Sequence, residues 1–140
     1  MKLVPYQHKV QYYETDKMGI VHHSNYIRWF EEARVDFLDQ VGMPYESVEA
    51  TGVISPVVSV ECKYHGMTHF GDTVTIVPRI TKFNGIRLVI AYEVRDIETG
   101  ELRCSGTSSH CYLDEAGHPV NLKKTNEALY QIYKNAMTWE

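Results

Sequence analysis

The spacing of apolar residues predicts one long helix near the N-terminus. Between residues 24 and 41, apolar side chains recur at steps of three and four, which places them on one face of a helix. Ser24 suits the N-cap position, and Gly42 followed by Pro44 is a stop signal. The stripe consists of Tyr26, Phe30, Ala33, Phe37 and Val41, widened by Trp29 and Leu38. Such a broad apolar face must be covered by the rest of the fold.

Four segments in which apolar and polar residues alternate follow this helix and predict consecutive strands. They cover residues 57–64, 73–83, 86–96 and 102–113. Asn84-Gly85 is a strong hairpin signal between the second and third segments, and Pro78 predicts a bulge or a locally unpaired edge. The last segment is rich in small residues, which predicts the close approach of another element or a ligand.

Weaker patterns flank this region. Residues 4–13 predict a first strand, residues 43–56 a loop with a short turn, and residues 122–136 a closing helix. The order β-α-β-β-β-β-α predicts an α+β fold in which a curved antiparallel sheet wraps around the early helix. Because so small a sheet leaves exposed strand edges, we expect a homodimer or a larger assembly.

Composition narrows the class of protein. A chain of 140 residues suits one core, so we expect residues 1–140 to form a single domain. The net charge of −4 gives no basic footprint for nucleic acid. The three cysteines form no C-x-x-C pair, which favours reduced thiols and a cytoplasmic location. Neither a signal-peptide core nor a membrane-length apolar run is present, so we expect no membrane insertion.

The strongest chemical signal lies just before the predicted helix, at Asp16, Gly19 and His23. A helix N-terminus offers unpaired N–H groups and partial positive charge, which an acyl-transfer enzyme needs for a developing oxyanion. Asp16 would act there as a nucleophile or as a general base for water. The alternative is turn chemistry, in which Asp16 bonds its own backbone and Gly19 is a turn glycine.

Two further side chains accompany this set. His23 would polarise a carbonyl or hold a water through its ring and offer its backbone N–H, or it is simply a partly exposed histidine at a helix start. Tyr12, four residues before Asp16, would orient the carboxylate through a hydrogen bond, or it is a tyrosine of a half-buried strand. Adjacent His22 is expected to face solvent.

The sequence motifs of other enzyme classes are absent. The chain has no H-E-x-x-H or zinc-finger spacing, and His65 and His69 lie in a predicted loop, so we expect no required metal. It also lacks the G-x-S-x-G elbow of serine hydrolases and the P-loop of nucleotide-binding enzymes.

One motif and the helix that follows it carry a family resemblance: Tyr12-x-x-x-Asp16-x-x-Gly19-x-Val21-x-His23-x-x-Tyr26, then Glu32, Ala33 and Arg34. This pattern resembles the hotdog-fold acyl-CoA thioesterases, in particular the 4-hydroxybenzoyl-CoA thioesterase-like branch with its Tol–Pal-associated members. The resemblance covers almost the whole chain. It implies a hotdog fold, hydrolysis of acyl-CoA thioesters, and dimers that often pair into tetramers.

The resemblance also implies roles for particular residues. Asp16 becomes the catalytic carboxylate, the backbone N–H of His23 polarises the thioester, and the His23 ring and Tyr12 are helpers. The site would lie at a dimer interface, with coenzyme A as part of the substrate and no cofactor required. Its phosphates would meet cations, for which we select Lys82, Arg87 and Lys63.

Several alternatives stay open at the level of sequence. The same scaffold suits an acyl-thioester hydratase or dehydratase, or a non-catalytic acyl-CoA binder. Residues 64–72 depart from the family's usual Pro-Ala-containing segment, so the acyl group is not fixed. Neither the choice between nucleophile and general base for Asp16 nor that between dimer and tetramer follows from the pattern.

Overall fold

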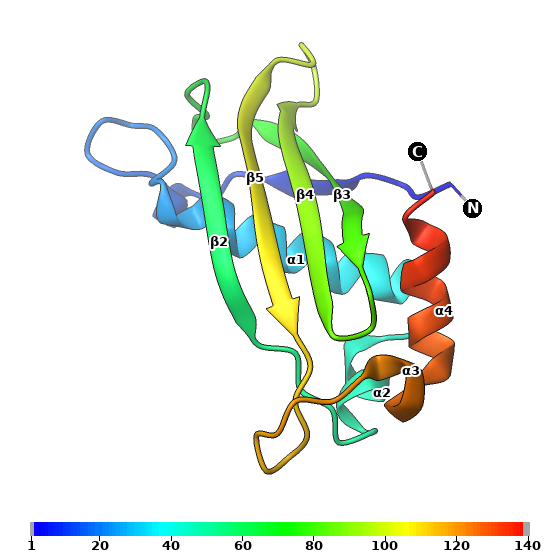
Figure 1. The fold of residues 1–140 in the computed structure, drawn as a ribbon. Helices are drawn as coiled ribbons and strands as arrows, with labels where there is room; N and C mark the ends of the chain where they lie inside the picture. The colour runs from blue at the N-terminus through cyan, green and yellow to red at the C-terminus, as the bar shows by residue number, and fades with distance from the viewer. Residues whose placement is uncertain (1, 139–140) are drawn as a thin grey trace.

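The computed structural model describes residues 2–138 and shows five strands packed against helices. A sheet and a long central helix make two layers, and short helices close one end (Figure 1). The strands are β1 (Tyr6–Lys9), β2 (Val57–Tyr64), β3 (Thr73–Phe83), β4 (Arg87–Asp96) and β5 (Leu102–Cys111). The helices are η1 (Tyr12–Glu14), α1 (Ser24–Gln40), α2 (Tyr45–Glu49), α3 (Leu122–Thr125) and α4 (Glu127–Ala136).

The sheet is antiparallel throughout and has the order β1-β3-β4-β5-β2. It curves around α1, which crosses behind the strands (Figure 1). The α+β arrangement of a sheet wrapped around an early helix is therefore confirmed. Because β3, β4 and β5 follow one another along the chain, short hairpins supply most of the pairing.

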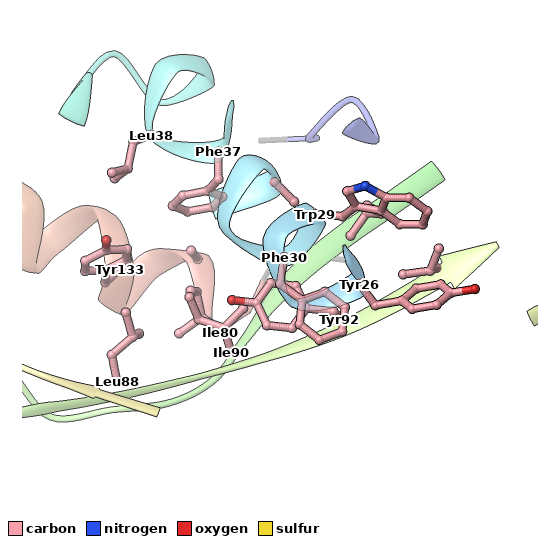
Figure 2. Close-up of a cluster of buried hydrophobic side chains, with 14 of the residues drawn as sticks. Tyr26, Trp29, Phe30, Phe37, Leu38, Ile80, Leu88, Ile90, Tyr92 and Tyr133 are labelled. Atoms are coloured by element: carbon pink, nitrogen blue, oxygen red, sulfur yellow. The ribbon is translucent and has the colours of Figure 1, made fainter. Parts of the chain in front are cut away.

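The apolar stripe of α1 forms the core. Trp29, Phe30 and Ala33 are fully buried, and Phe30 stacks on Tyr92 of β4 with ring centroids 4.2 Å apart. Figure 2 shows these rings between the helix and the sheet, with Phe37 beside Tyr133 of α4. Each large apolar side chain buried here contributes about 1.5–3 kcal/mol to stability, so packing on this face fixes α1.

The small residues of β5 make room for that packing, as the sequence predicted. A Cβ added to Gly106 would lie 2.7 Å from Cε2 of Phe30 and would also collide with the carbonyl oxygen of Glu61. The helix thus comes close to the sheet where β5 has no side chain.

Turn chemistry also follows the sequence. Gly85 has a φ of +89°, and Asn84 Oδ1 accepts hydrogen bonds from the backbone N–H groups of Ile86 and Arg87. Within residues 2–138, pairing of β3 with β1 stops at Ile76, so Pro78 lies on a locally unpaired edge. The irregularity in the β3–β4 pairing falls between Ile80 and Lys82 instead.

Three predicted elements were wrong in detail. The first strand is shorter than residues 4–13, since β1 ends at Lys9 and the chain turns into η1 at Tyr12. Residues 43–56 contain the helix α2. The closing helix is divided at Asn126, whose φ of −153° breaks the helix and whose Oδ1 accepts a hydrogen bond from the backbone N–H of Leu129.

The edge strand β2 is left open by the described chain. It pairs only with β5 there, and Val57, Val58 and Val60 are 50%, 51% and 37% exposed. An apolar strand edge of this kind is a template for pairing with another chain. Across residues 2–138, none of the helices has both the length and the apolar character needed to cross a membrane.

Candidate active site

The loop that carries Asp16 is a tight turn between η1 and α1, and it projects beside the end of β2 (Figure 1). Thr15 and Val21 form an antiparallel bridge that closes it. Inside this bridge, the backbone N–H of Asp16 donates to Ile20, and that of Gly19 donates to Asp16, each at 2.9 Å. Gly19 has a φ of +78°, which a residue with a side chain adopts only at a cost of about 1–2 kcal/mol.

The Asp16 carboxylate accepts a hydrogen bond within the turn and also faces the pockets beside it. Its Oδ1 accepts a 2.8 Å hydrogen bond from the backbone N–H of Met18, the turn role weighed as an alternative. Its Oδ2 accepts no hydrogen bond from any residue in the described part of the chain. The half-buried side chain lines two pockets, so one oxygen fixes its position while the other is available to a ligand.

His23 lies at the N-terminal end of α1. The structure places it, rather than Ser24, at the N-cap, although its side chain makes no capping hydrogen bond. Within residues 2–138, its backbone N–H donates no hydrogen bond. The exposed ring stacks on His22 with centroids 4.1 Å apart. This helix start therefore offers an unpaired donor, which a developing oxyanion requires.

A pocket of ≈ 340 Å³ brings Asp16 and His23 together. Tyr64, at the end of β2, forms part of its wall, and its hydroxyl donates a 3.2 Å hydrogen bond to the His23 carbonyl oxygen. The Tyr64 ring also packs against Tyr26 at 5.5 Å. Sequence reasoning missed Tyr64, because it lies 41 positions from His23 and only the folding of β2 brings the two residues together.

Glu14 anchors the base of the loop, and sequence reasoning missed this residue as well. It is 5% exposed, and its Oε1 accepts hydrogen bonds from the backbone N–H of Gln11 at 2.8 Å and from His8 Nε2 at 2.7 Å. Its Oε2 accepts a 2.7 Å bond from the indole of Trp29. Burial acts to raise the pKa of Glu14, but these three hydrogen bonds outweigh it and lower the pKa below its ordinary value.

The expected hydrogen bond between Tyr12 and Asp16 is absent from the contacts of residues 2–138. The Tyr12 side chain is 77% exposed, and its ring packs edge-on against Phe70 at 5.7 Å. Tyr12 begins η1 instead of continuing a strand, so its side chain turns outward. Tyr12 and Asp16 do line one wide pocket of ≈ 810 Å³, together with the cations Lys17 and Arg28.

The three selected cations do not converge on Asp16 within one chain. Lys82 and Arg87 are exposed and flank the β3–β4 turn, and Lys82 lies nine strand positions or about 30 Å from Thr73, at the end of β3 nearest the Asp16 loop. Lys63 lines a pocket with Glu61 and Arg79. It alternates with Tyr64 along β2 and so lies on the sheet face opposite α1.

The histidines considered as metal ligands make other contacts. His65 Nε2 lies 2.8 Å from Ser105 Oγ, and His69 Nδ1 lies 3.8 Å from a carboxylate oxygen of Asp72. Among residues 2–138, no group of three or more His, Cys, Asp or Glu side chains is arranged to hold a metal ion.

Comparison with known proteins places this geometry in context. The model of the thioesterase-like superfamily matches residues 10–130. YneP of Bacillus subtilis (strain 168) is 36% identical over 129 residues, which are 91% of this chain and 93% of YneP. The acyl-CoA thioester hydrolase YbgC of Escherichia coli O157:H7 is 27% identical over 90 residues, 64% of this chain and 67% of that protein.

Solved structures agree with the arrangement of sheet and helix. The DHNA-CoA thioesterase of Staphylococcus aureus superposes with a TM-score of 0.89 at 30% identity. The match covers 94% of this chain and 88% of that protein.

Proposed function

The chain belongs to the thioesterase-like superfamily, and from this premise we propose that it hydrolyses acyl-CoA thioesters to a free acid and coenzyme A. One observation carries the proposal. Asp16, with one carboxylate oxygen unpartnered, and the N-terminal end of α1, with the unpaired N–H of His23, line the same pocket. This supplies an anionic group for a carbonyl carbon and a donor for its oxygen.

The proposed reaction has two balanced forms. In one, Asp16 attacks the thioester carbon, the sulfur leaves as coenzyme A thiolate, and water then hydrolyses the mixed anhydride. In the other, Asp16 takes a proton from water, whose oxygen attacks the carbon directly; the carbon–sulfur bond then breaks, and the leaving coenzyme A sulfur takes up that proton. In both, charge gathers on the carbonyl oxygen, next to the start of α1. The His23 ring and Tyr12 are proposed helpers, since each lines a pocket that Asp16 also lines.

We further propose a homodimer joined through β2. Across a two-fold axis two β2 strands run antiparallel, so the Val57 end of one copy lies beside the Tyr64 end of its partner. The β3–β4 hairpin lies near the Val57 end, because Arg87 pairs with Cys111, whose N–H donates to Pro56. This pairing moves Lys82 and Arg87 of one copy toward Asp16 of the other, where coenzyme A phosphates would bind.

The experiment measures thiol release from short, long and aromatic acyl-CoAs by the purified protein. Asp16→Asn should lower turnover by about 10²–10⁴-fold with an unchanged melting temperature. Asp39→Asn, which alters an exposed aspartate at the other end of α1, is the matched control and should stay fully active. Undiminished turnover in Asp16→Asn removes Asp16 from the mechanism. Conversion of an enoyl thioester to its hydrated form would indicate the hydratase instead.

A further inference from the structure

A second cavity lies at the opposite end of α1 from Asp16. It measures ≈ 460 Å³ and shares no lining residue with either pocket that Asp16 lines. Much of its wall is apolar, built from Phe37, Leu38, Ile80, Leu88 and Ile90. Figure 2 shows these side chains gathered at one end of the helix near Tyr133. Arg34, which also lines the cavity, lies ten residues or about 15 Å along α1 from Ser24.

Arg34 brings a positive charge to this apolar space without a counter-ion. Its Nη1 donates a 3.1 Å hydrogen bond to the hydroxyl of Tyr92, and the side chain is half-buried. Among residues 2–138, no carboxylate forms an ion pair with Arg34. Glu31 lines the same cavity but is not paired with it. A partly desolvated guanidinium without an anion is costly, which favours an anionic ligand.

Tyr112 contributes a second unsatisfied group to the same cavity. Its side chain is 2% exposed, and its hydroxyl has no hydrogen-bond partner within the described chain. A buried hydroxyl without a partner destabilises the folded state unless a ligand or a water satisfies it. Arg34 lies on α1 and Tyr112 directly follows β5, yet both line this space, so the two observations are independent.

Among the other polar side chains of the wall, His110 is already hydrogen-bonded and carries no second positive charge. His110 Nε2 lies 2.8 Å from Ser108 Oγ, which in turn lies 2.7 Å from the hydroxyl of Tyr92. Burial, and then the nearby charge of Arg34, lower the pKa of His110 to about 4, so its ring is neutral at pH 7. The cavity therefore offers the half-buried cation of Arg34 and the free hydroxyl of Tyr112 beside apolar walls, with the exposed carboxylate of Glu31 as its one acidic group.

We propose that this cavity binds a free medium-chain aliphatic carboxylate. Its hydrocarbon chain lies against Phe37, Leu38 and Ile90, and its carboxylate accepts hydrogen bonds from Arg34 and Tyr112. Charge, hydrogen-bonding capacity and an apolar wall together select an amphipathic anion over a neutral or cationic ligand. A free acid is also the product of the proposed reaction, but its binding in this cavity goes beyond that function, because it involves neither Asp16 nor hydrolysis.

The test is a calorimetric titration of the full chain with octanoate. We expect saturable binding with one octanoate per chain, and weaker binding of 1-octanol, octylammonium and acetate. Arg34→Met should weaken octanoate binding by roughly tenfold or more, since a charge-assisted hydrogen bond is lost. Tyr112→Phe should weaken it several-fold while the melting temperature stays the same or rises. A merely structural Tyr112 would leave octanoate affinity unchanged.

Three outcomes would overturn the proposal. The first is the absence of saturable octanoate binding. The second is equal octanoate affinity in the wild type and in the folded Tyr112→Phe and Arg34→Met variants. The third is binding of 1-octanol as tight as that of octanoate. Dissociation of an oligomer by Arg34→Met, without octanoate binding to the wild type, would assign Arg34 to a subunit contact instead. The Asp16→Asn variant separates the two hypotheses, because it should lose thiol release and still bind octanoate.

Discussion

The indole nitrogen of Trp29 donates a 2.7 Å hydrogen bond to the buried carboxylate of Glu14, which ties the central helix to the base of the Asp16 loop. The Glu14 backbone extends this link. Its carbonyl oxygen accepts hydrogen bonds from the backbone N–H of His22 and from the Asn25 side chain, each at 2.8 Å. Glu14 thus holds both ends of the loop, and the geometry around Asp16 depends on it.

Replacing Glu14 should therefore destabilise the protein. In Glu14→Gln, one amide oxygen and one nitrogen face three donors, so at least one donor loses its acceptor at a cost of about 1–3 kcal/mol. Urea unfolding at pH 7 measures the loss, and Glu49→Gln, on an exposed residue, is the control. Equal unfolding free energies for wild type and Glu14→Gln would contradict the anchoring role.

The same variant has a predictable pH dependence. The pKa of Glu14 is lowered in the folded state, so its charge stabilises the fold above the ordinary value of 4.5. That stabilisation is lost as the pH falls through the lowered folded-state pKa. The difference in unfolding free energy between wild type and Glu14→Gln should therefore be largest near neutrality and shrink in acid.

Protonation of His110 should lower the free energy of unfolding in mild acid. Its pKa is about 4 in the folded state and near 6.5 in the unfolded chain, so the unfolded chain binds more protons between these values. The stabilisation from neutral His110 is complete above pH 6.5 and disappears as the pH falls toward 4, by up to about 1.4 kcal/mol per pH unit. In His110→Gln this part of the slope should be missing. Parallel curves for the two proteins would argue against a buried neutral imidazole.

The open edge of β2 predicts how the chain assembles. Wild type should sediment as a dimer or larger assembly, and Val60→Lys, which places a charge on this edge, should shift it toward monomer. Val4→Lys is the control, because Val4 is 68% exposed outside the sheet. If the partner completes the site, thiol release should fall with the dimer fraction. A Val60→Lys protein that remains dimeric would place the interface elsewhere.

Replacing Lys82 and Arg87 should weaken the binding of acyl-CoA without slowing the chemical step. Their joint replacement by alanine should raise KM for acyl-CoA several-fold and leave kcat unchanged, because a phosphate contact remote from the thioester binds substrate and transition state equally. Steady-state kinetics at low and high salt test this, with Lys9→Ala, in the edge strand β1, as the control. An unchanged KM would remove these cations from the substrate site.

The sequence alone predicted much of the framework, for local reasons. The stripe of α1 has a 3.6-residue period, β3 and β4 alternate, and Asn84-Gly85 encodes its own turn, so each element follows from neighbours along the chain. The predicted bounds of β2 and β3 match the structure. The first strand failed because the local pattern is weak, and η1 depends on Glu14 meeting His8 and Trp29.

By itself, then, the sequence determined the order of elements, the apolar face of α1 and the motif that places Asp16 before a helix start. Only the tertiary structure decided that Tyr64 reaches His23, that Tyr12 turns away from Asp16, and that Arg34 and Tyr112 share one cavity. The physical reason is the separation along the chain of the residues that interact. Periodicity and turn chemistry act between residues a few positions apart, whereas these contacts join segments that meet only when the sheet closes over α1.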